Sequence, residues 1–257
     1  MFLLVSAVFP PEPVVSAQIS NDLANAMLVR NDIVVICPRP TRPAGMKYEM
    51  VESEAVPFRR IILKSYVHPG PSFFGRMIES ISFGRAGKNF IQENKNDISV
   101  IYANTWPLFA QLNVARVCRK YNIPLVLHVQ DIYPETFTDK LGRAGVLIKK
   151  LLLPIDKYVL RSSTTVVAIG HKMVEFLSAT RGIDMKKIAV IYNWQDELRF
   201  KGSIDDSHKN EKFTFMYLGS LSPSANIEAV IEAFGDAGLR DSTLVIAGSG
   251  NSKESCL

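Results

Sequence analysis

The sequence predicts an α/β protein built on a parallel β-sheet, with one complete domain and the start of a second. Short apolar runs rich in β-branched residues alternate with amphipathic stretches from residue 2 to residue 192. A polar interval over 196–212 then shows almost no periodicity, and the alternation restarts at residue 213. Strand–helix–strand alternation of this kind is typical of a parallel sheet covered by helices on both faces.

The first sixty residues contain the least regular part of this pattern. The apolar run 2–9 predicts a buried strand, and 17–29 places apolar residues at helical spacing. A second β-branched run covers 33–37 and is closed by prolines. We interpret the less regular stretches 51–58 and 61–63 as a third strand.

From residue 72 onward the alternation becomes sharper. One predicted helix begins at Pro107, and proline is favoured in the first turn of a helix. Another is expected to be kinked or broken at Pro154, since proline removes a backbone donor. The helices are predicted over 72–94, 107–121, 145–160 and 171–180, and the strands over 98–102, 124–129, 165–169 and 188–192.

The polar interval divides the chain into two parts. Residues 1–195 predict a complete Rossmann-like domain, 196–212 a linker, and 213–257 a second Rossmann-like domain. The second part holds only two strands, 213–218 and 243–247, with one helix over 226–234. Two strands and one helix cannot bury both faces of a parallel sheet. We expect this domain to be truncated, because a linker separates the two patterns; addition of these elements to the edge of the first sheet is the alternative.

Composition places the chain among ordinary globular proteins. Hydrophobic residues make up 47% and charged residues 21%, with a net charge of +5. Three scattered cysteines form no disulfide or metal pattern, and the first strand lacks the flanks of a signal peptide, so we expect a cytoplasmic protein. No apolar run is long enough to span a bilayer. Scattered basic residues without a groove-entering motif argue against nucleic acid as a partner.

Ligands bind beyond the carboxyl ends of the strands in open parallel sheets, so the segments after the strands are the candidate sites. The loop after the first strand holds no glycine fingerprint for a dinucleotide, which argues against a nicotinamide-dependent enzyme. Its backbone amides at a helix start suit an anion or sugar hydroxyls, and a rigid proline-rich connection is the alternative. A polar residue and a tryptophan after the strand 98–102 suit carbohydrate, or else the indole packs under the loop. The candidate ligand-binding residues here are Pro11, Glu12, Val15, Ser16, Asn104 and Trp106.

The segment 127–135 is the most distinctive in the chain. His128, Asp131 and Glu135 concentrate titratable groups at one strand end. We predict His128 and Asp131 as catalytic residues and Glu135 as a ligand contact, while a structural histidine remains the alternative.

Candidate phosphate or ribose contacts follow the strands of the second part. Glycine after each strand lets a diphosphate approach the backbone, and the following helix start complements its charge. The segment that closes the last strand of the first domain either borders an interdomain cleft or forms a simple hinge. The candidate binding residues of these segments are Asn193, Gly219, Ser220, Asn226, Gly248 and Gly250.

Taken in order, these segments resemble the retaining glycosyltransferases of family 4, which have the GT-B architecture, and most of all the bacterial branch that builds surface polysaccharides. The matching pieces are Phe-Pro-Pro-Glu at 9–12, Asp-Ile-Tyr-Pro-Glu at 131–135, Val-Ile-Tyr-Asn-Trp at 190–194, Tyr-Leu-Gly-Ser-Leu at 217–221 and Ala-Gly-Ser-Gly at 247–250.

The resemblance implies a division of labour between the two domains. The first would bind the acceptor through the loop 10–17 and the segment 128–135, and the second a nucleotide-sugar near Gly219. The resemblance thus makes the non-catalytic candidates up to Glu135 acceptor-binding residues and those from Asn193 onward donor-binding residues. It implies no metal and no cofactor beyond the nucleotide-sugar substrate. The expected product belongs to lipopolysaccharide, capsule or exopolysaccharide biosynthesis, with a saccharide or polyprenyl-linked acceptor.

Three departures from the family pattern stand out. Val14 and Val15 occupy positions where the family usually has glycine, and Ser220 stands where it has a basic residue. The family's two glutamates that hold the donor would lie beyond residue 257. We therefore expect little transfer by this chain alone, and a non-catalytic remnant or pseudoenzyme is the alternative.

The predicted helix 145–160 carries a further expectation. Lys149, Lys150, Lys157 and Arg161 lie at helical spacing beside the leucines 151–153. Such a surface suits the anionic inner face of the cytoplasmic membrane, and a solvated helix face is the alternative.

Overall fold

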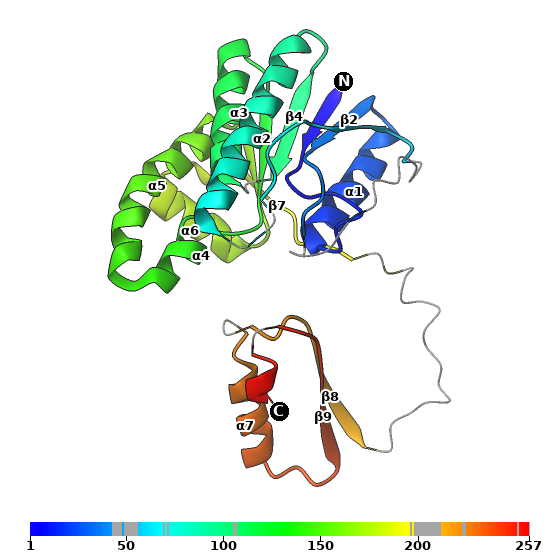
Figure 1. Ribbon diagram of the computed structural model, residues 1–257, viewed down its shortest axis with the longest axis vertical. Helices are drawn as coiled ribbons and strands as arrows, with labels where there is room; N and C mark the ends of the chain where they lie inside the picture. Colours follow the sequence, from blue (N-terminus) through cyan, green and yellow to red (C-terminus); the bar gives the residue numbers. More distant parts are fainter. Residues whose placement is uncertain are drawn as a thin grey trace. The chain divides into compact units, whose positions relative to one another are not determined.

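The computed structural model describes residues 1–42, 48, 56–68, 70, 72–104, 107–195, 197, 212–222, 225–250 and 252–256. The chain divides into two compact units, Met1–Gln195 and Asp196–Leu257. Each unit is described by itself (Figure 1).

The first unit is built on a parallel sheet of seven strands in the order β3-β2-β1-β4-β5-β6-β7. The order reverses between β1 and β4, which makes the carboxyl ends of these two strands a topological switch point, where open α/β sheets bind ligands. The strands are β1 (Phe2–Val5), β2 (Ile33–Cys37), β3 (Arg59–Ile62), β4 (Val100–Asn104), β5 (Leu125–Val129), β6 (Thr165–Ala168) and β7 (Ile188–Val190).

Helices connect the strands of this unit. The helix α3 begins after Pro107 and ends at Asn122, whose left-handed backbone closes it, and α6 ends in the same way at Gly182. The helices are α1 (Val15–Leu28), α2 (Phe73–Glu93), α3 (Leu108–Tyr121), α4 (Glu135–Thr138), α5 (Gly142–Ser162) and α6 (His171–Arg181), with short 3₁₀ turns η1 (Asp139–Leu141) and η2 (Met185–Lys187).

The core lies on both faces of the sheet, as the period-2 pattern of the strands requires. Leu3, Val5 and Leu127 face a large cluster that includes residues of α2, α3, α5 and α6. Phe2 and Leu4, the alternate residues of β1, face a smaller cluster that includes residues of α1. The α/β class with a parallel sheet is thus confirmed.

Several predicted bounds were wrong. The first strand ends at Val5 rather than Phe9, because the buried Ser6 hydroxyl donates to the Val8 carbonyl and turns the chain. Pro154 lies inside α5 without ending it. The third strand is Arg59–Ile62, whereas most of the stretch 51–58 lies outside the described residues.

The second unit has β8 (Phe213–Leu218) parallel to β9 (Ser242–Ala247), with α7 (Ile227–Asp236) between them in sequence and η5 (Glu254–Cys256) after them. Phe213, Met216 and Leu218 are at least 65% exposed although they are large and apolar. Two strands and one helix do not cover these side chains.

No described helix is both long enough and apolar enough to cross a bilayer.

Candidate functional site

The switch point contains a buried polar network. Asn104, at the end of β4, donates from Nδ2 to the hydroxyls of Ser6 (3.3 Å) and Ser20 (3.0 Å). These two hydroxyls lie 3.0 Å apart, and Gln111 of α3 donates to the Asn104 carbonyl. All four residues are buried. The predicted acceptor residue Asn104 therefore ties β4 to β1 and α1, and its contact with a sugar stays a prediction.

The loop after β1 is anchored by Glu12. Its carboxylate accepts hydrogen bonds from the backbone amides of Phe9 (3.2 Å), Thr41 (2.7 Å) and Arg42 (2.8 Å). Burial raises the pKa of Glu12, although these three bonds oppose the shift. Glu12 thus connects the loop to the segment that follows β2, a role that the sequence alone did not indicate.

The same loop leads into the start of α1. Val14 provides no side-chain cap, and the Ala17 and Gln18 amides donate to its carbonyl, which leaves the amides of Val15 and Ser16 for another partner. Val15 is 56% exposed. Pro11 is exposed, and Ser16 is half-buried. This arrangement leaves Pro11, Val15 and Ser16 accessible, whereas the Glu12 carboxylate is already occupied. The predicted contact at Trp106 lies outside the described residues.

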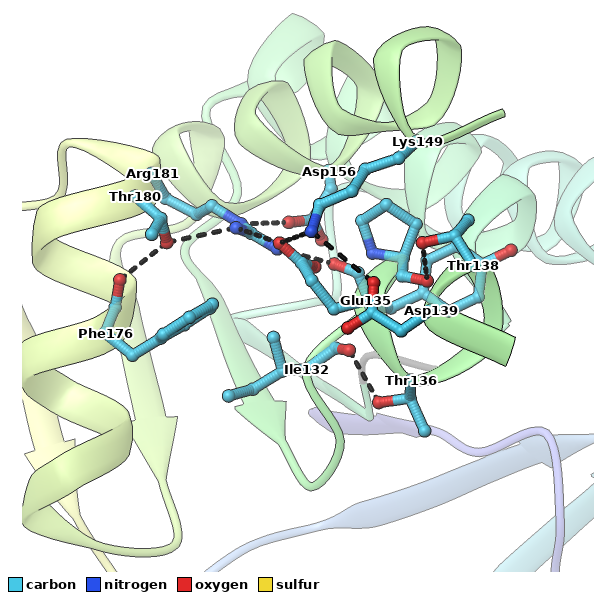
Figure 2. A network of polar contacts seen from close by, with 12 residues as sticks. Ile132, Glu135, Thr136, Thr138, Asp139, Lys149, Asp156, Phe176, Thr180 and Arg181 are labelled. Carbon is cyan, nitrogen blue, oxygen red and sulfur yellow. Dashed lines mark hydrogen bonds and ion pairs between the residues drawn. The ribbon is translucent and has the colours of Figure 1, made fainter. Parts of the chain in front are cut away.

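Arg181, the last residue of α6, forms hydrogen bonds with the segment that follows β5 (Figure 2). Arg181 is 1% exposed. Its two Nη atoms donate to the two carboxylate oxygens of Glu135 at 2.8 and 2.5 Å, and Nη2 also donates to the Tyr133 carbonyl at 2.9 Å. Its Nε donates to Asp156 of α5 at 2.8 Å. One guanidinium thus joins α6, α5 and the 133–135 segment.

Further contacts complete this network. Lys149 of α5 lies 3.6 Å from a Glu135 oxygen and 3.7 Å from Asp139. Thr136 and Thr138 donate to the carbonyls of Ile132 and Pro134. Figure 2 shows the Glu135 side chain directed toward Arg181 and Lys149. The carboxylate of Glu135, a predicted acceptor contact, is therefore engaged by two cations of the protein.

The two carboxylates around Arg181 differ in their electrostatics. Burial raises the pKa of Asp156 to about 6, although its hydrogen bond with Arg181 opposes the rise. For Glu135, burial is the largest single influence and acts to raise the pKa, but the hydrogen bonds and charge of Arg181, a backbone hydrogen bond and the charge of Lys149 together hold the pKa below its usual value. Asp156 and Arg181 were missed at the sequence level, because an arginine in the last helical turn is common for dipole reasons alone.

The two predicted catalytic residues lie in different environments. His128 is 0% exposed, and its ring packs edge-on against Tyr102 with centroids 5.9 Å apart. Within the described residues neither ring nitrogen has a hydrogen-bond partner, and burial lowers the pKa of His128 to about 4. Asp131 is exposed. The structure does not bring the two side chains to one surface, and their catalytic roles stay predictions.

The loops that follow β8 and β9 pack closely against each other. The Gly219 amide donates to the Ala247 carbonyl (3.0 Å), and the Leu221 amide donates to the Ser249 carbonyl (2.9 Å). A Cβ at Gly248 would lie 1.8 Å from the Gly219 carbonyl oxygen, and one at Gly250 would lie 2.0 Å from that of Leu221. Both glycines are thus required by the packing of the two loops, whether or not a diphosphate binds there.

The remaining candidates are polar and accessible. Asn193 is exposed after β7, Ser220 lies exposed in the loop after β8, and Asn226 adopts a left-handed backbone (φ 49°) directly before α7. Within the described part of the chain, no group of three or more His, Cys, Asp or Glu side chains is arranged to hold a metal ion.

Comparison with known proteins identifies the family. Residues 17–194, nearly all of the first unit, match the Glycosyl transferase 4-like domain family. No curated protein is similar enough in sequence to match.

Several solved structures share the fold. The Anabaena protein Alr3699/HepE, in complex with UDP, aligns with a TM-score of 0.60 and 16% identity over 99% of this chain and 62% of its own. A glycosyltransferase from Rickettsia africae aligns at 0.55 and 12% identity over 96% and 60% of the two chains. The lipopolysaccharide outer core galactosyltransferase WaaB aligns at 0.55 and 15% identity over 100% and 63%.

The chain spans about 62% of the length of HepE. The sequence match covers the first unit, and the structural match extends over both. On this evidence the chain belongs to the Glycosyl transferase 4-like domain family, and its fold is that of the GT-B glycosyltransferases.

Proposed function

We propose that this chain is part of a retaining glycosyltransferase that moves a sugar from a nucleotide-sugar to a saccharide acceptor. The single observation that carries the proposal is the family match over residues 17–194. HepE, a protein of the same fold, was crystallised with UDP and with UDP-glucose, which supports a nucleotide-sugar as the donor. WaaB, another neighbour, is a lipopolysaccharide galactosyltransferase, which supports a surface-polysaccharide product.

The first unit would bind the acceptor at the carboxyl ends of its strands. The accessible groups there are the start of α1 at Val15 and Ser16 and the exposed carboxylate of Asp131. Arg181 fixes the backbone that follows Asp131, so the carboxylate would be presented with little loss of conformational entropy on binding.

The second unit would bind the diphosphate of the donor through other amides of the loops after β8 and β9, since those of Gly219 and Leu221 already donate to the Ala247 and Ser249 carbonyls. These loops, Gly-Ser-Leu-Ser at 219–222 and Gly-Ser-Gly at 248–250, contain no lysine or arginine. A departing diphosphate would then rely on backbone amides. Loss of one hydrogen-bond donor to the developing charge typically costs about 3 kcal/mol of transition-state stabilisation. We therefore propose that the chain alone transfers slowly or not at all.

Thermal shift and transfer assays test this proposal. We expect UDP-glucose or another nucleotide-sugar to raise the melting temperature of the wild-type chain. Where transfer is measurable, Asp131→Asn should lower it, whereas Asp236→Asn, which changes a carboxylate at the end of α7, serves as the matched control. If no nucleotide-sugar shifts the melting temperature, the non-catalytic alternative, a remnant or pseudoenzyme, replaces the donor proposal.

We also propose that the acceptor is lipid-linked and that α5 rests on the cytoplasmic face of the membrane. Leu147 and Leu151 are 64% and 66% exposed on α5, beside the exposed Lys150. Exposed leucines next to a lysine suit an anionic lipid surface. Of the other predicted basic residues, Lys149 pairs with Glu135, and Arg161 donates to the Arg181 carbonyl.

Vesicle flotation with and without anionic lipid tests this surface. We expect binding only to the anionic vesicles, and Leu151→Gln combined with Lys150→Glu should abolish it. Lys172→Glu, on an exposed position of α6, is the control for charge reversal. Equal flotation with neutral and anionic vesicles would contradict the membrane proposal.

A further inference from the structure

Two adjoining hollows lie between the residues after β3 and the outer side of α2. Their volumes are about 680 and 350 Å³. Lys64, Tyr66 and Ser82 line both of them, so they form one continuous depression, which we call the α2 groove. The groove begins at the carboxyl end of the edge strand β3 and continues along α2 to Asn89.

The α2 groove is strongly basic. Arg39, Lys64 and Arg85 line it and are exposed, and none of its lining residues is acidic. Within the described part of the chain these three cations form no ion pair. The nearby carboxylate of Glu79 is occupied, because it accepts hydrogen bonds from Arg76 and from the His68 amide. Three uncompensated cations in one depression attract an anion.

The groove also holds groups that recognise a sugar ring. The Tyr66 side chain is 47% exposed, and its position is fixed, since its hydroxyl lies 3.1 Å from His68 Nδ1 and its amide donates to Ser82 Oγ at 2.8 Å. Such a ring offers an apolar face for stacking. Asn89 contributes an exposed amide.

Ser65 supplies a second, independent sign of a ligand. Its Oγ atom is buried at the groove, and within the described residues it has no hydrogen-bond partner. A buried hydroxyl without a partner costs about 1–3 kcal/mol. A rotation of the Ser65 side chain toward the groove would let a ligand oxygen recover this cost.

From these contacts we propose that the α2 groove binds an acidic sugar, one that carries a carboxylate or a phosphate. The cations would hold the anionic group, while Tyr66, Asn89 and Ser65 would hold the ring and its hydroxyls. That this sugar belongs to the acceptor rests on the proposed function; the binding itself does not.

Calorimetric titration of the full chain tests the proposal with four probes. They are a disaccharide that ends in glucuronic acid, the neutral disaccharide with glucose in that place, glucose 6-phosphate and inorganic phosphate. We expect at least one acidic sugar to bind about tenfold more tightly than the neutral disaccharide, because one charge-assisted hydrogen bond contributes about that factor. The affinity should fall with added salt.

Variants locate the binding. Lys64→Gln and Arg85→Gln should each weaken the acidic sugar about tenfold, since each removes one exposed cation from the groove. Lys88→Gln is the matched control, because Lys88 is exposed on α2 but does not line the groove. Ser65→Ala should weaken every sugar that binds.

Specific outcomes overturn the proposal. Equal affinities for the acidic and the neutral disaccharide would show that the cations do not contribute to binding. If Lys88→Gln weakened the affinity for the acidic sugar as much as Lys64→Gln does, the sugar would bind outside the groove. Inorganic phosphate that binds as tightly as glucose 6-phosphate would show an ion site without sugar recognition. A chain that binds the acidic sugar but no nucleotide-sugar would contradict only the proposed function, and the reverse result would contradict only the groove.

Discussion

Replacement of Arg181 by methionine is the sharpest test of the network behind the 133–135 segment. Methionine fills a similar volume but leaves Glu135 and the buried Asp156 without their shared cation. Loss of one partner from a buried ion pair typically costs about 3–5 kcal/mol, mainly because a charge is left buried and uncompensated. Arg181→Met should therefore lower the free energy of unfolding of the first unit by about that amount.

Urea denaturation followed by tryptophan fluorescence measures this loss. Both tryptophans of the chain, Trp106 and Trp194, lie within residues 1–195, so the signal reports on the first unit. Arg181→Lys keeps the charge but loses the planar fork that reaches three partners, and it should fall between wild type and Arg181→Met.

The pH dependence follows from the pKa of Asp156. Burial already raises it to about 6 with Arg181 present, so the carboxylate opposes folding increasingly as the pH rises through 6. At pH 5 the Asp156 carboxyl is thus already mostly protonated in the wild type, and more so without Arg181, because its pKa should then rise further. The loss caused by Arg181→Met should thus be smaller at pH 5 than at pH 8, and adding Asp156→Asn should restore part of the stability. A loss below about 1 kcal/mol at pH 8, the range of surface ion pairs, would refute this reasoning.

Three further predictions follow. Asn104→Ala should cost about 1–3 kcal/mol in the same urea assay, because it leaves the buried hydroxyls of Ser6 and Ser20 without their donor. The imidazole of His128 should remain neutral down to about pH 4 in an NMR titration. Because its pKa is lower in the folded state, its contribution to stability is lost as the pH falls from about 6.5 toward 4. A titration midpoint near 6.5 would contradict its burial. Gly248→Ala should separate the loops after β8 and β9, so that hydrogen exchange of the Gly219 and Leu221 amides becomes faster, whereas Gly235→Ala, where a Cβ meets nothing within 4 Å, should leave it unchanged.

Much of the fold was predictable because it depends on local patterns. Six of the seven strands of the first unit are apolar runs flanked by polar or proline-containing segments, and the helices between them have clear apolar spacing. The bounds of the edge strand β3, Arg59–Ile62, were not predictable, because none of its residues is fully buried and its apolar pattern is weak. The short helix α4 has only four residues, too few to show a period.

The site was less predictable, because its contacts join residues far apart in the sequence. Arg181 reaches Glu135 across 46 positions, and Glu12 reaches Arg42 across 30. Nothing in the local sequence of Glu12 or Glu135 distinguishes a carboxylate that binds a substrate from one that fixes a loop. The sequence around His128 likewise does not show whether its ring is buried or accessible, because this depends on which side of β5 the ring faces.

The exposed strands of the second unit have a consequence for handling the protein. The side chains of Phe213, Met216 and Leu218 meet water in both folded and unfolded forms, so folding this unit gains little hydrophobic free energy. Local opening there should require far less energy than opening the first unit. Limited proteolysis should begin in the second unit, and its parallel strands offer a template for strand addition between molecules at high concentration.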